Sequence, residues 1–254
     1  MIEIGSALDP GRKRITKKNQ DSLCVIRPSL LRMNGSLRIN WRPPLLVIAD
    51  GMGGYEGGAV ASQVVVESFS NAYLNAKGSL PPQEVLQAGI TTALNGLKVQ
   101  AEANPALDRM GSTVVAAILS GRSIYLLNVG DSRAYLINKN AVQQLSYDHS
   151  LVGEHLRQGL IQEEEVRTHP RRNVLSMSIS AQREQVEPFT GVFSWQPGDH
   201  LVLCSDGLWG PVTEPQIQAV VLEYRPRLAA QKLVDLANNN QGPDNISVII
   251  ARFR

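Results

Sequence analysis

Acidic side chains in this chain occur where apolar runs end, beside glycine. Asp50 follows the apolar run 45–49 and opens the sequence Asp-Gly-Met-Gly-Gly, and Asp206 follows the run 201–204 and precedes Gly207. A carboxylate at the end of a strand can point into a cleft, while glycine lets the main chain approach a ligand closely. Each segment taken alone is also compatible with a simple capped turn, because Asp-Gly is a common turn dipeptide.

Three further aspartates occupy similar boundaries. Asp21 opens the first apolar stretch, Asp131 follows the run 124–129 after one glycine, and Asp244 lies shortly before the run 246–251. Hard divalent cations such as Mg²⁺ and Mn²⁺ take oxygen ligands and keep several waters, so a few aspartates from different strands suffice to hold them. The recurrence of aspartate at strand ends therefore predicts a site for divalent cations.

Other catalytic chemistries have no matching pattern in the sequence. The 4 histidines and 2 cysteines are scattered without the spacing of a zinc site. A Gly-x-Ser-x-Gly nucleophile motif and a phosphate-binding loop ending in Gly-Lys-Ser or Gly-Lys-Thr are also missing. We interpret His149 and His169 as local or substrate-side residues rather than metal ligands. A metal-activated water is the nucleophile that remains.

Composition indicates an ordinary soluble protein. The 25 basic and 23 acidic residues leave a formal net charge of +2, which does not suggest a nucleic-acid partner. The basic cluster 12–18 is either a solvated loop or a surface that attracts phosphate.

Cys24 and Cys204 form no disulfide framework, which fits a reducing cytoplasm. No apolar run approaches the roughly 20 residues that span a bilayer, so we expect no membrane segment in this chain.

Hydrophobic periodicity predicts the elements that must position the aspartates. Buried strands are expected at 45–49, 114–119, 124–129, 201–204 and 246–251. Helices are expected at 59–76, 82–103, 151–167, 214–223 and 228–238. The stretch 27–44, with Asn34-Gly35 as its turn, predicts a hairpin.

The order of these elements favours one fold class. Strands are interrupted by a helical pair, strands follow again, and helices come last, which is not regular strand-helix alternation. A largely antiparallel α+β sandwich is therefore expected, rather than a doubly wound parallel sheet. No repeat or linker divides the chain, so residues 1–254 are predicted to form a single domain.

Taken together, these segments resemble the protein phosphatase 2C family, the metal-dependent serine/threonine protein phosphatases, and in particular its bacterial branch. The matching motifs occur in family order along nearly the whole chain. They are NQDS at 19–22, VIADGMGG at 47–54, MGSTVVAAIL at 110–119, LNVGDSRAYLI at 127–137, the stretch from DHS at 148–150 to HPRRN at 169–173, LVLCSDGLWG at 201–210, and GPDNISVIIARF at 242–253.

The resemblance implies a four-layer α-β-β-α sandwich, two antiparallel sheets flanked by helices, with two Mg²⁺ or Mn²⁺ ions and a weaker third in a cleft. By motif match, Asp50 bridges the two metals, the Gly51 carbonyl and Asp21 serve one each, and Asp206 and Asp244 complete the second. Asp131, with Asp206, matches the weaker third site. The implied catalytic set is Asp21, Asp50, Asp206 and Asp244.

The implied activity is hydrolysis of phosphoserine and phosphothreonine in proteins by a metal-activated water. The implied partner is a phosphorylated protein, the target of a serine/threonine kinase. A cytoplasmic, monomeric signalling enzyme is expected, and residues 151–170 are expected to form a flap that tunes substrate choice.

Several residues depart from the family pattern. Gln20 replaces the usual Glu before the first metal-site aspartate, and Met52 replaces a His that occurs in eukaryotic members. The arginine that usually grips the substrate phosphate is Thr16 here, which leaves Arg14, Lys17 and Lys18 as candidates for that role. The stretch 176–181 also lacks the usual Thr-Arg-Ala-Leu-Gly.

These departures keep alternatives open. A catalytically weak or inactive pseudophosphatase would use the fold to bind phosphoproteins, and an enzyme dedicated to one phosphoserine regulator, such as an anti-sigma-factor antagonist, would have the same sequence features. A purely structural domain would leave the aspartates unexplained. The complete aspartate set favours an enzyme, because five clustered acids without a cation would repel one another.

Overall fold

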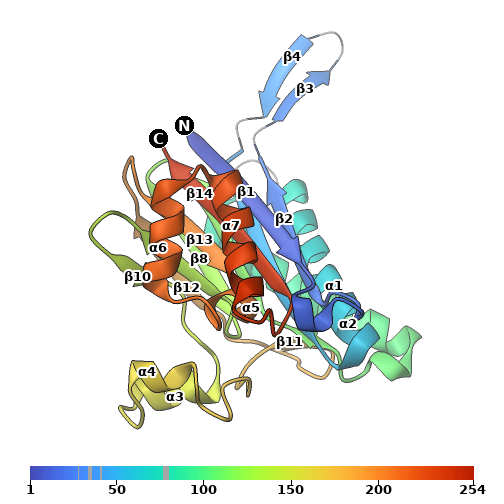
Figure 1. Ribbon diagram of the computed structural model, residues 1–254. Helices are drawn as coiled ribbons and strands as arrows, with labels where there is room; N and C mark the ends of the chain where they lie inside the picture. Colours follow the sequence, from blue (N-terminus) through green and yellow to red (C-terminus); the bar gives the residue numbers. More distant parts are fainter. Residues whose placement is uncertain (28, 34–35, 41, 77–79) are drawn as a thin grey trace.

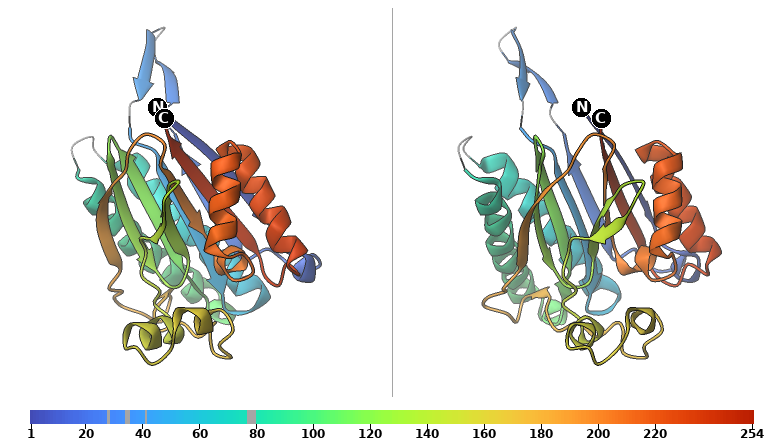
Figure 2. Two further views of the ribbon diagram at one scale, coloured as in Figure 1. Left: turned by 60° about the vertical axis from the view of Figure 1, so that its left-hand side comes forward. Right: turned by 90° about the vertical axis from the view of Figure 1, so that its left-hand side faces the viewer.

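Two antiparallel β-sheets pack face to face, and a pair of helices covers the outer face of each sheet (Figure 2). The computed structural model describes residues 1–27, 29–33, 36–40, 42–76 and 80–254. The layer order is helices, sheet, sheet, helices, so the predicted four-layer sandwich is confirmed.

The first sheet is built from both ends of the chain and from its middle. Its strands, in spatial order, are β1 (Ile2–Asp9), β14 (Ile246–Phe253), β13 (His200–Cys204), β9 (Arg133–Ile137) and β10 (Val142–Gln144). Helices α6 (Glu214–Glu223) and α7 (Pro226–Asn239) cover its outer face. β1 and β14 pair along their whole lengths, and the Met1 amino group donates to the Arg254 carbonyl oxygen at 3.1 Å. The two ends of the chain therefore lie side by side (Figure 1).

The second sheet carries the other helical pair. Its strands, in order, are β11 (Ile179–Ser180), β6 (Gly111–Ser112), β5 (Leu45–Met52), β7 (Val114–Ser120), β8 (Ser123–Val129) and β12 (Phe189–Ser194), with β2 (Asp21–Ile26) paired to β5. Helices α1 (Gly54–Asn75) and α2 (Pro82–Ala103) cover its outer face. Short 3₁₀ turns lie at η1 (Arg12–Arg14) and η2 (Pro105–Leu107).

The strands at the centre of the sandwich are buried on both faces. Ile48, Leu203 and Ile249 lie in the core between the two sheets, all fully buried. Their strand neighbours Val47 and Val248 point the other way, into the cores beneath the helices. Strands with two buried faces read as continuous apolar runs. This explains why the runs were visible in the sequence.

Most predicted elements are confirmed, and one prediction is wrong. The helix expected at 151–167 is instead two short helices, α3 (Leu151–Arg157) and α4 (Glu163–Val166). The chain turns between them through Gly159 with φ of 70°, a left-handed conformation that glycine adopts without strain. Ser150 begins α3 by accepting a hydrogen bond from the Gly153 amide. This segment lies at one end of the sandwich (Figure 1).

The predicted hairpin is also present. β3 (Ser29–Met33) and β4 (Ser36–Asn40) pair antiparallel and project from the opposite end of the sandwich (Figure 1). The turn expected at Asn34-Gly35 lies outside the described residues. In the described part of the chain, no helix is long and apolar enough to cross a membrane.

Candidate metal centre

Two neighbouring strands bring the first aspartates together. β2 and β5 run antiparallel with Asp21 opposite Asp50 in the register. Beyond Asp50 the chain turns sharply, and α1 begins at Gly54 after Gly53, whose φ is 115°. A side chain at Gly51 would place its Cβ 1.8 Å from the Gly58 carbonyl oxygen, so this close crossing of main chain on main chain requires glycine.

The other aspartates lie at the ends of strands of the facing sheet, or in the turn that connects the two sheets. Asp131 lies in the turn between β8 and β9, and Asp206 is the first residue of the short helix α5 (Asp206–Trp209) after β13. Asp244 lies just before β14. All three, with Asp50, line one cavity of about 250 Å³. Its lining residues are Arg14, Gln20, Asp50, Gly51, Met52, Gly53, Gly54, Thr113, Asp131, Asn173, Leu175, Asp206 and Asp244.

Asp21 lies behind this lining rather than on it. Its Oδ2 atom accepts hydrogen bonds from the hydroxyls of Ser205 at 2.8 Å and Ser247 at 2.6 Å, and the residue is buried. These contacts join β2 to the segment that carries Asp206. Direct metal ligation by Asp21 stays a prediction, and the observed contacts give it a supporting place beside Asp50.

Gln20 takes the cavity-facing position next to Asp21. Its side-chain amide donates to the Gly54 carbonyl oxygen at 2.8 Å, and its Oε1 accepts from the Arg14 guanidinium. A neutral amide in this place removes one negative charge from the cavity wall, while its oxygen can still accept a hydrogen bond from a water.

Burial and mutual repulsion govern the electrostatics of the cavity. Burial, followed by the charges of Asp21 and Asp206, raises the pKa of Asp50 well above its ordinary value. Burial and the neighbouring Asp244 raise the pKa of Asp206 to about 7. Burial and the charge of Asp206 likewise raise the pKa of Asp131. A divalent cation would relieve this repulsion, which is the electrostatic condition of a metal site.

The oxygen donors fit a magnesium or manganese centre. Among the described residues, Oδ1 of Asp21 and Oδ1 of Asp206 are buried and have no hydrogen-bond partner. No group of three or more His, Cys, Asp or Glu side chains in the described ranges is already closed around a single point. The carboxylates surround the cavity with room for water, which Mg²⁺ usually keeps in its coordination shell.

Of the three basic residues predicted to bind substrate, the structure brings Arg14 to the cavity. The turn η1 is held by a hydrogen bond from the Lys13 amide to the Gly242 carbonyl oxygen at 3.0 Å. Arg14 then reaches inward and forms an ion pair with Asp244. Lys17 and Lys18 are exposed and are not among the residues that line the cavity. Arg14 therefore lies at the cavity wall, and its contact with a substrate phosphate stays a prediction.

Two histidines have local roles, in line with their interpretation from sequence. His149 is buried, and its Nδ1 accepts a hydrogen bond from the Gly130 amide at 3.2 Å. Nδ1 of His169 accepts from the Arg171 amide at 3.1 Å. Neither lines the cavity.

Sequence reasoning missed the residues that hold Asp50 from the next strand. The Thr113 amide donates to the Asp50 carbonyl oxygen at 2.8 Å, and the Asp50 amide donates to Thr113 Oγ1 at 3.1 Å. Asn173 and Leu175 were also missed as lining residues. Thr113 and Asn173 lie in the motifs MGST and HPRRN, but their side chains carry no obvious metal chemistry, and Leu175 lies two residues beyond the second motif.

A sequence profile described as protein phosphatase 2C matches residues 37–239. The chain belongs to the protein phosphatase 2C family. It is 37% identical to the serine/threonine phosphatase stp of Listeria innocua, over 82% of this chain and 84% of that protein.

Solved structures of the protein phosphatase 2C fold agree with this membership. Stp1 from Staphylococcus aureus superposes with a TM-score of 0.88 at 30% identity, over 100% of this chain and 96% of that one. The catalytic domain of PstP, solved in complex with two manganese ions, gives a TM-score of 0.81 at 29% identity, over 99% and 97% of the two chains. The predicted family and fold are confirmed.

Proposed function

We propose that this chain is a protein serine/threonine phosphatase that hydrolyses phosphoserine and phosphothreonine with two Mn²⁺ or Mg²⁺ ions. The observation that supports this most is the convergence of Asp50, Asp131, Asp206 and Asp244 on one cavity beside Arg14. These residues lie far apart along the chain and have no other evident reason to share a cavity. The relative PstP carries two manganese ions.

The residues that would hold the cations follow from their positions. Asp50 and the Gly51 carbonyl lie at the end of β5, and Asp206 and Asp244 lie across the cavity on the facing sheet. Asp131, next to Asp206, would contribute to a weaker third position. When bound, the ions lower the pKa of a water and neutralise charge on the phosphoryl oxygens.

The protein itself supplies orientation of the substrate. A guanidinium presents a planar fork that matches two phosphate oxygens, and Arg14 carries it at the cavity wall. Met52 stands where eukaryotic members have histidine, and none of the described lining residues is a histidine. The leaving serine or threonine oxygen would therefore take its proton from water.

The organisation around the site supports further parts of this proposal. Residues 1–254 would act as a single catalytic domain and as a monomer, since one chain supplies the whole cavity. Helices α3 and α4, within residues 151–170, would form the flap, because Asn173 and Leu175 directly after it line the cavity. The substrate would be a protein that a serine/threonine kinase has phosphorylated. A reducing cytoplasm fits the free Cys24 and Cys204.

Hydrolysis of an aryl phosphate with and without Mn²⁺ tests the proposal. We expect Mn²⁺-dependent turnover that Asp50→Ala abolishes and that Asp206→Asn reduces by more than about tenfold, since even residues that only support a metal ligand typically cost roughly 10–100-fold when mutated. Asp235→Asn, an exposed aspartate on α7, serves as the matched control and should leave turnover unchanged. Normal Mn²⁺-dependent turnover by Asp50→Ala would refute the assignment.

The pseudophosphatase alternative has less support. This alternative was favoured by the absence of a phosphate-binding arginine at position 16, where the chain has Thr16. In the structure, Arg14 lies at the cavity instead. Tight binding of a phosphopeptide with no Mn²⁺-dependent hydrolysis would favour it.

A further inference from the structure

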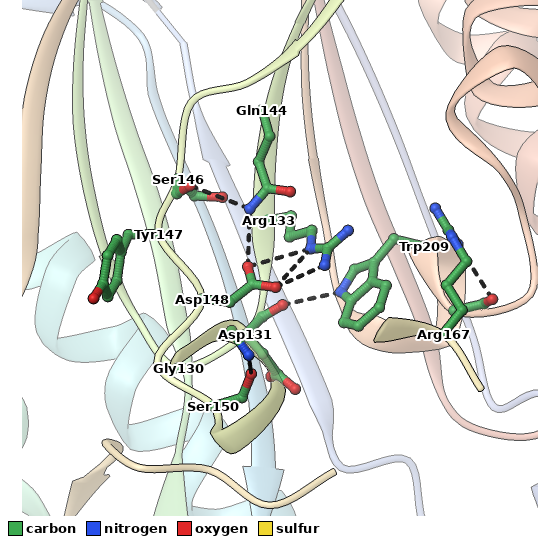
Figure 3. A network of polar contacts seen from close by, with 12 residues as sticks. Gly130, Asp131, Arg133, Gln144, Ser146, Tyr147, Asp148, Ser150, Arg167 and Trp209 are labelled. Atoms are coloured by element: carbon green, nitrogen blue, oxygen red, sulfur yellow. Dashed lines mark hydrogen bonds and ion pairs between the residues drawn. The ribbon is translucent and has the colours of Figure 1, made fainter. Parts of the chain in front are cut away.

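Two of the cavity aspartates are linked through a side chain outside the predicted site. Asp206 begins the single-turn helix α5, and Trp209 ends it. The buried indole of Trp209 donates a hydrogen bond from Nε1 to the Asp131 carbonyl oxygen at 2.9 Å (Figure 3). One indole therefore ties the helix that carries Asp206 to the main chain of Asp131.

Arg133 stacks on the face of this indole. Its guanidinium carbon lies 3.7 Å from the centre of the Trp209 ring, within the range of a cation–π contact. Arg133 is only two residues beyond Asp131, so the chain from Asp131 to Arg133, the stacked ring and the indole hydrogen bond form a closed loop of contacts (Figure 3). A closed loop of this kind restricts the motion of the Asp131 main chain.

Asp148 fixes Arg133 in turn. Its Oδ2 accepts from Nη2 at 2.7 Å and from Nε at 3.0 Å, its Oδ1 accepts from Nε at 3.2 Å, and both residues are buried. Gln144 also donates to Asp148 Oδ1 at 3.0 Å (Figure 3). A bidentate pair fixes the plane of the guanidinium, and the plane determines how it stacks on the ring.

The flap is attached to the same network at two points. Arg157, the last residue of α3, donates to the Asp148 carbonyl oxygen at 3.1 Å. Arg167, directly after α4, donates to the carbonyl oxygens of Gly210 at 3.3 Å and Val212 at 3.0 Å, just beyond α5. The flap is thus hydrogen-bonded to Asp148, which holds Arg133, and to the chain directly after α5.

We infer that Trp209 is a positioning residue which, clamped by Arg133 and Asp148, sets the spacing of Asp131 and Asp206 and so the affinity of a weakly bound divalent cation between them. The inference rests on the proposed function, since it takes these carboxylates as a metal site. It concerns residues that hold the ligands rather than the ligands themselves. Trp209 makes no contact with the cation in this account.

Trp209→Phe is the sharpest variant, because it removes the Nε1–H donor and keeps a ring beneath Arg133. Trp195→Phe is the matched control: Trp195 is equally buried, and its Nε1 donates at 3.2 Å to the Gly121 carbonyl oxygen, in the turn between β7 and β8. Each variant loses one indole hydrogen bond, but only the first loses one to the main chain of a cavity aspartate.

Calorimetric titration of the full chain with Mn²⁺, without substrate, measures each binding step. We expect Trp209→Phe to weaken the weakest step by up to about fivefold, the limit set by the free energy of one ordinary hydrogen bond, and to leave the tighter steps unchanged. Trp195→Phe should match the unmodified chain at every step. Arg133→Lys, which keeps the charge and loses the planar fork, should weaken the same step.

Three outcomes would overturn the inference: a Trp209→Phe isotherm equal to that of the unmodified chain, equal weakening of all steps, or the same weakening in Trp195→Phe. If Trp209→Phe does not fold in a thermal unfolding assay, Arg133→Lys decides by the same criteria. An unmodified chain without Mn²⁺-dependent hydrolysis would instead contradict the proposed function, so the two failures are distinguishable.

Discussion

At the scale of single residues, Arg14 is the side chain from the basic cluster 12–18 that lines the cavity. Thr16 is exposed, whereas the turn η1 directs Arg14 inward to Asp244 and Gln20. Sequence spacing alone could not choose among Arg14, Lys17 and Lys18. The choice depends on how a 3₁₀ turn points a long side chain, and a cluster of basic residues carries no signal for that.

Arg14→Gln should raise KM for a phosphopeptide about tenfold or more and lower kcat less, because a charged hydrogen bond to the phosphate is lost in both the bound and the reacting state. Steady-state kinetics at saturating Mn²⁺ measures both constants. Lys17→Gln and Lys18→Gln are the controls, and a KM unchanged in Arg14→Gln would exclude this arginine as the phosphate contact.

The cavity acids also predict a link between pH and metal. The pKa of Asp206 is raised to about 7 and that of Asp21 to about 6, both mainly by burial, from an ordinary value of 3.8. The folded metal-free protein therefore binds more protons than the unfolded chain between about pH 4 and pH 7, and these groups lower its stability as pH rises through that window. Mn²⁺ must displace the same protons.

We therefore expect Mn²⁺ to raise Tm more at about pH 7.5 than at about pH 5.5, as measured by scanning calorimetry. Burial lowers the pKa of His149 and His200, which acts on stability in the opposite direction. That contribution is present with and without metal, so it largely cancels in the Mn²⁺-induced shift. The same shift at both pH values would contradict the prediction.

At the scale of elements, the crossing of β5 and α1 explains the glycines around Asp50. From sequence, these glycines were interpreted as making room for a ligand. The structure shows that Gly51 and Gly58 also make room for each other, since a Cβ on Gly51 would meet the Gly58 carbonyl. Contacts between main chains of separate elements cannot be seen in a local pattern.

Gly58→Ala should destabilise the protein by about 1–3 kcal/mol, the usual cost of overpacking. The added Cβ would lie 2.1 Å from Nε2 of Gln20 and 2.7 Å from the Gly51 carbonyl oxygen. Urea denaturation measures the loss. Gly57→Ala in the same turn is the control: its nearest neighbour is Cβ of Met110 at 3.3 Å, and the gain in helix propensity offsets part of the cost. Equal stability of both variants would contradict this account.

Other elements show which parts of the fold a hydrophobic pattern can predict and which it cannot. The strands of the sandwich centre and helix α2 were predictable because their apolar faces are long and regular. α5 is a single turn and carries too few residues for any periodicity. The flap has a helical pattern throughout, but Gly159 in a left-handed conformation divides it.

At the scale of the whole molecule, the cavity depends on both sheets at once. Asp50 belongs to one sheet, and Asp131, Asp206 and Asp244 come from loops of the other or between the two. The aspartates could be found from sequence because each stands at a strand end. Their convergence followed from family resemblance, since the packing of two sheets is set by contacts between residues far apart along the chain.

The pairing of β1 with β14 has a consequence for engineering. Because Met1 and Arg254 are in hydrogen-bond contact, a short glycine-serine linker could join the two residues and cyclise the backbone into a ring. Opening that ring between the exposed Lys139 and Asn140, in the turn that leads to the edge strand β10, should give a circular permutant with native circular dichroism and undiminished aryl phosphate hydrolysis. Opening it at Gly53-Gly54 should abolish that hydrolysis, because the cut separates Asp50 from the helix that braces it.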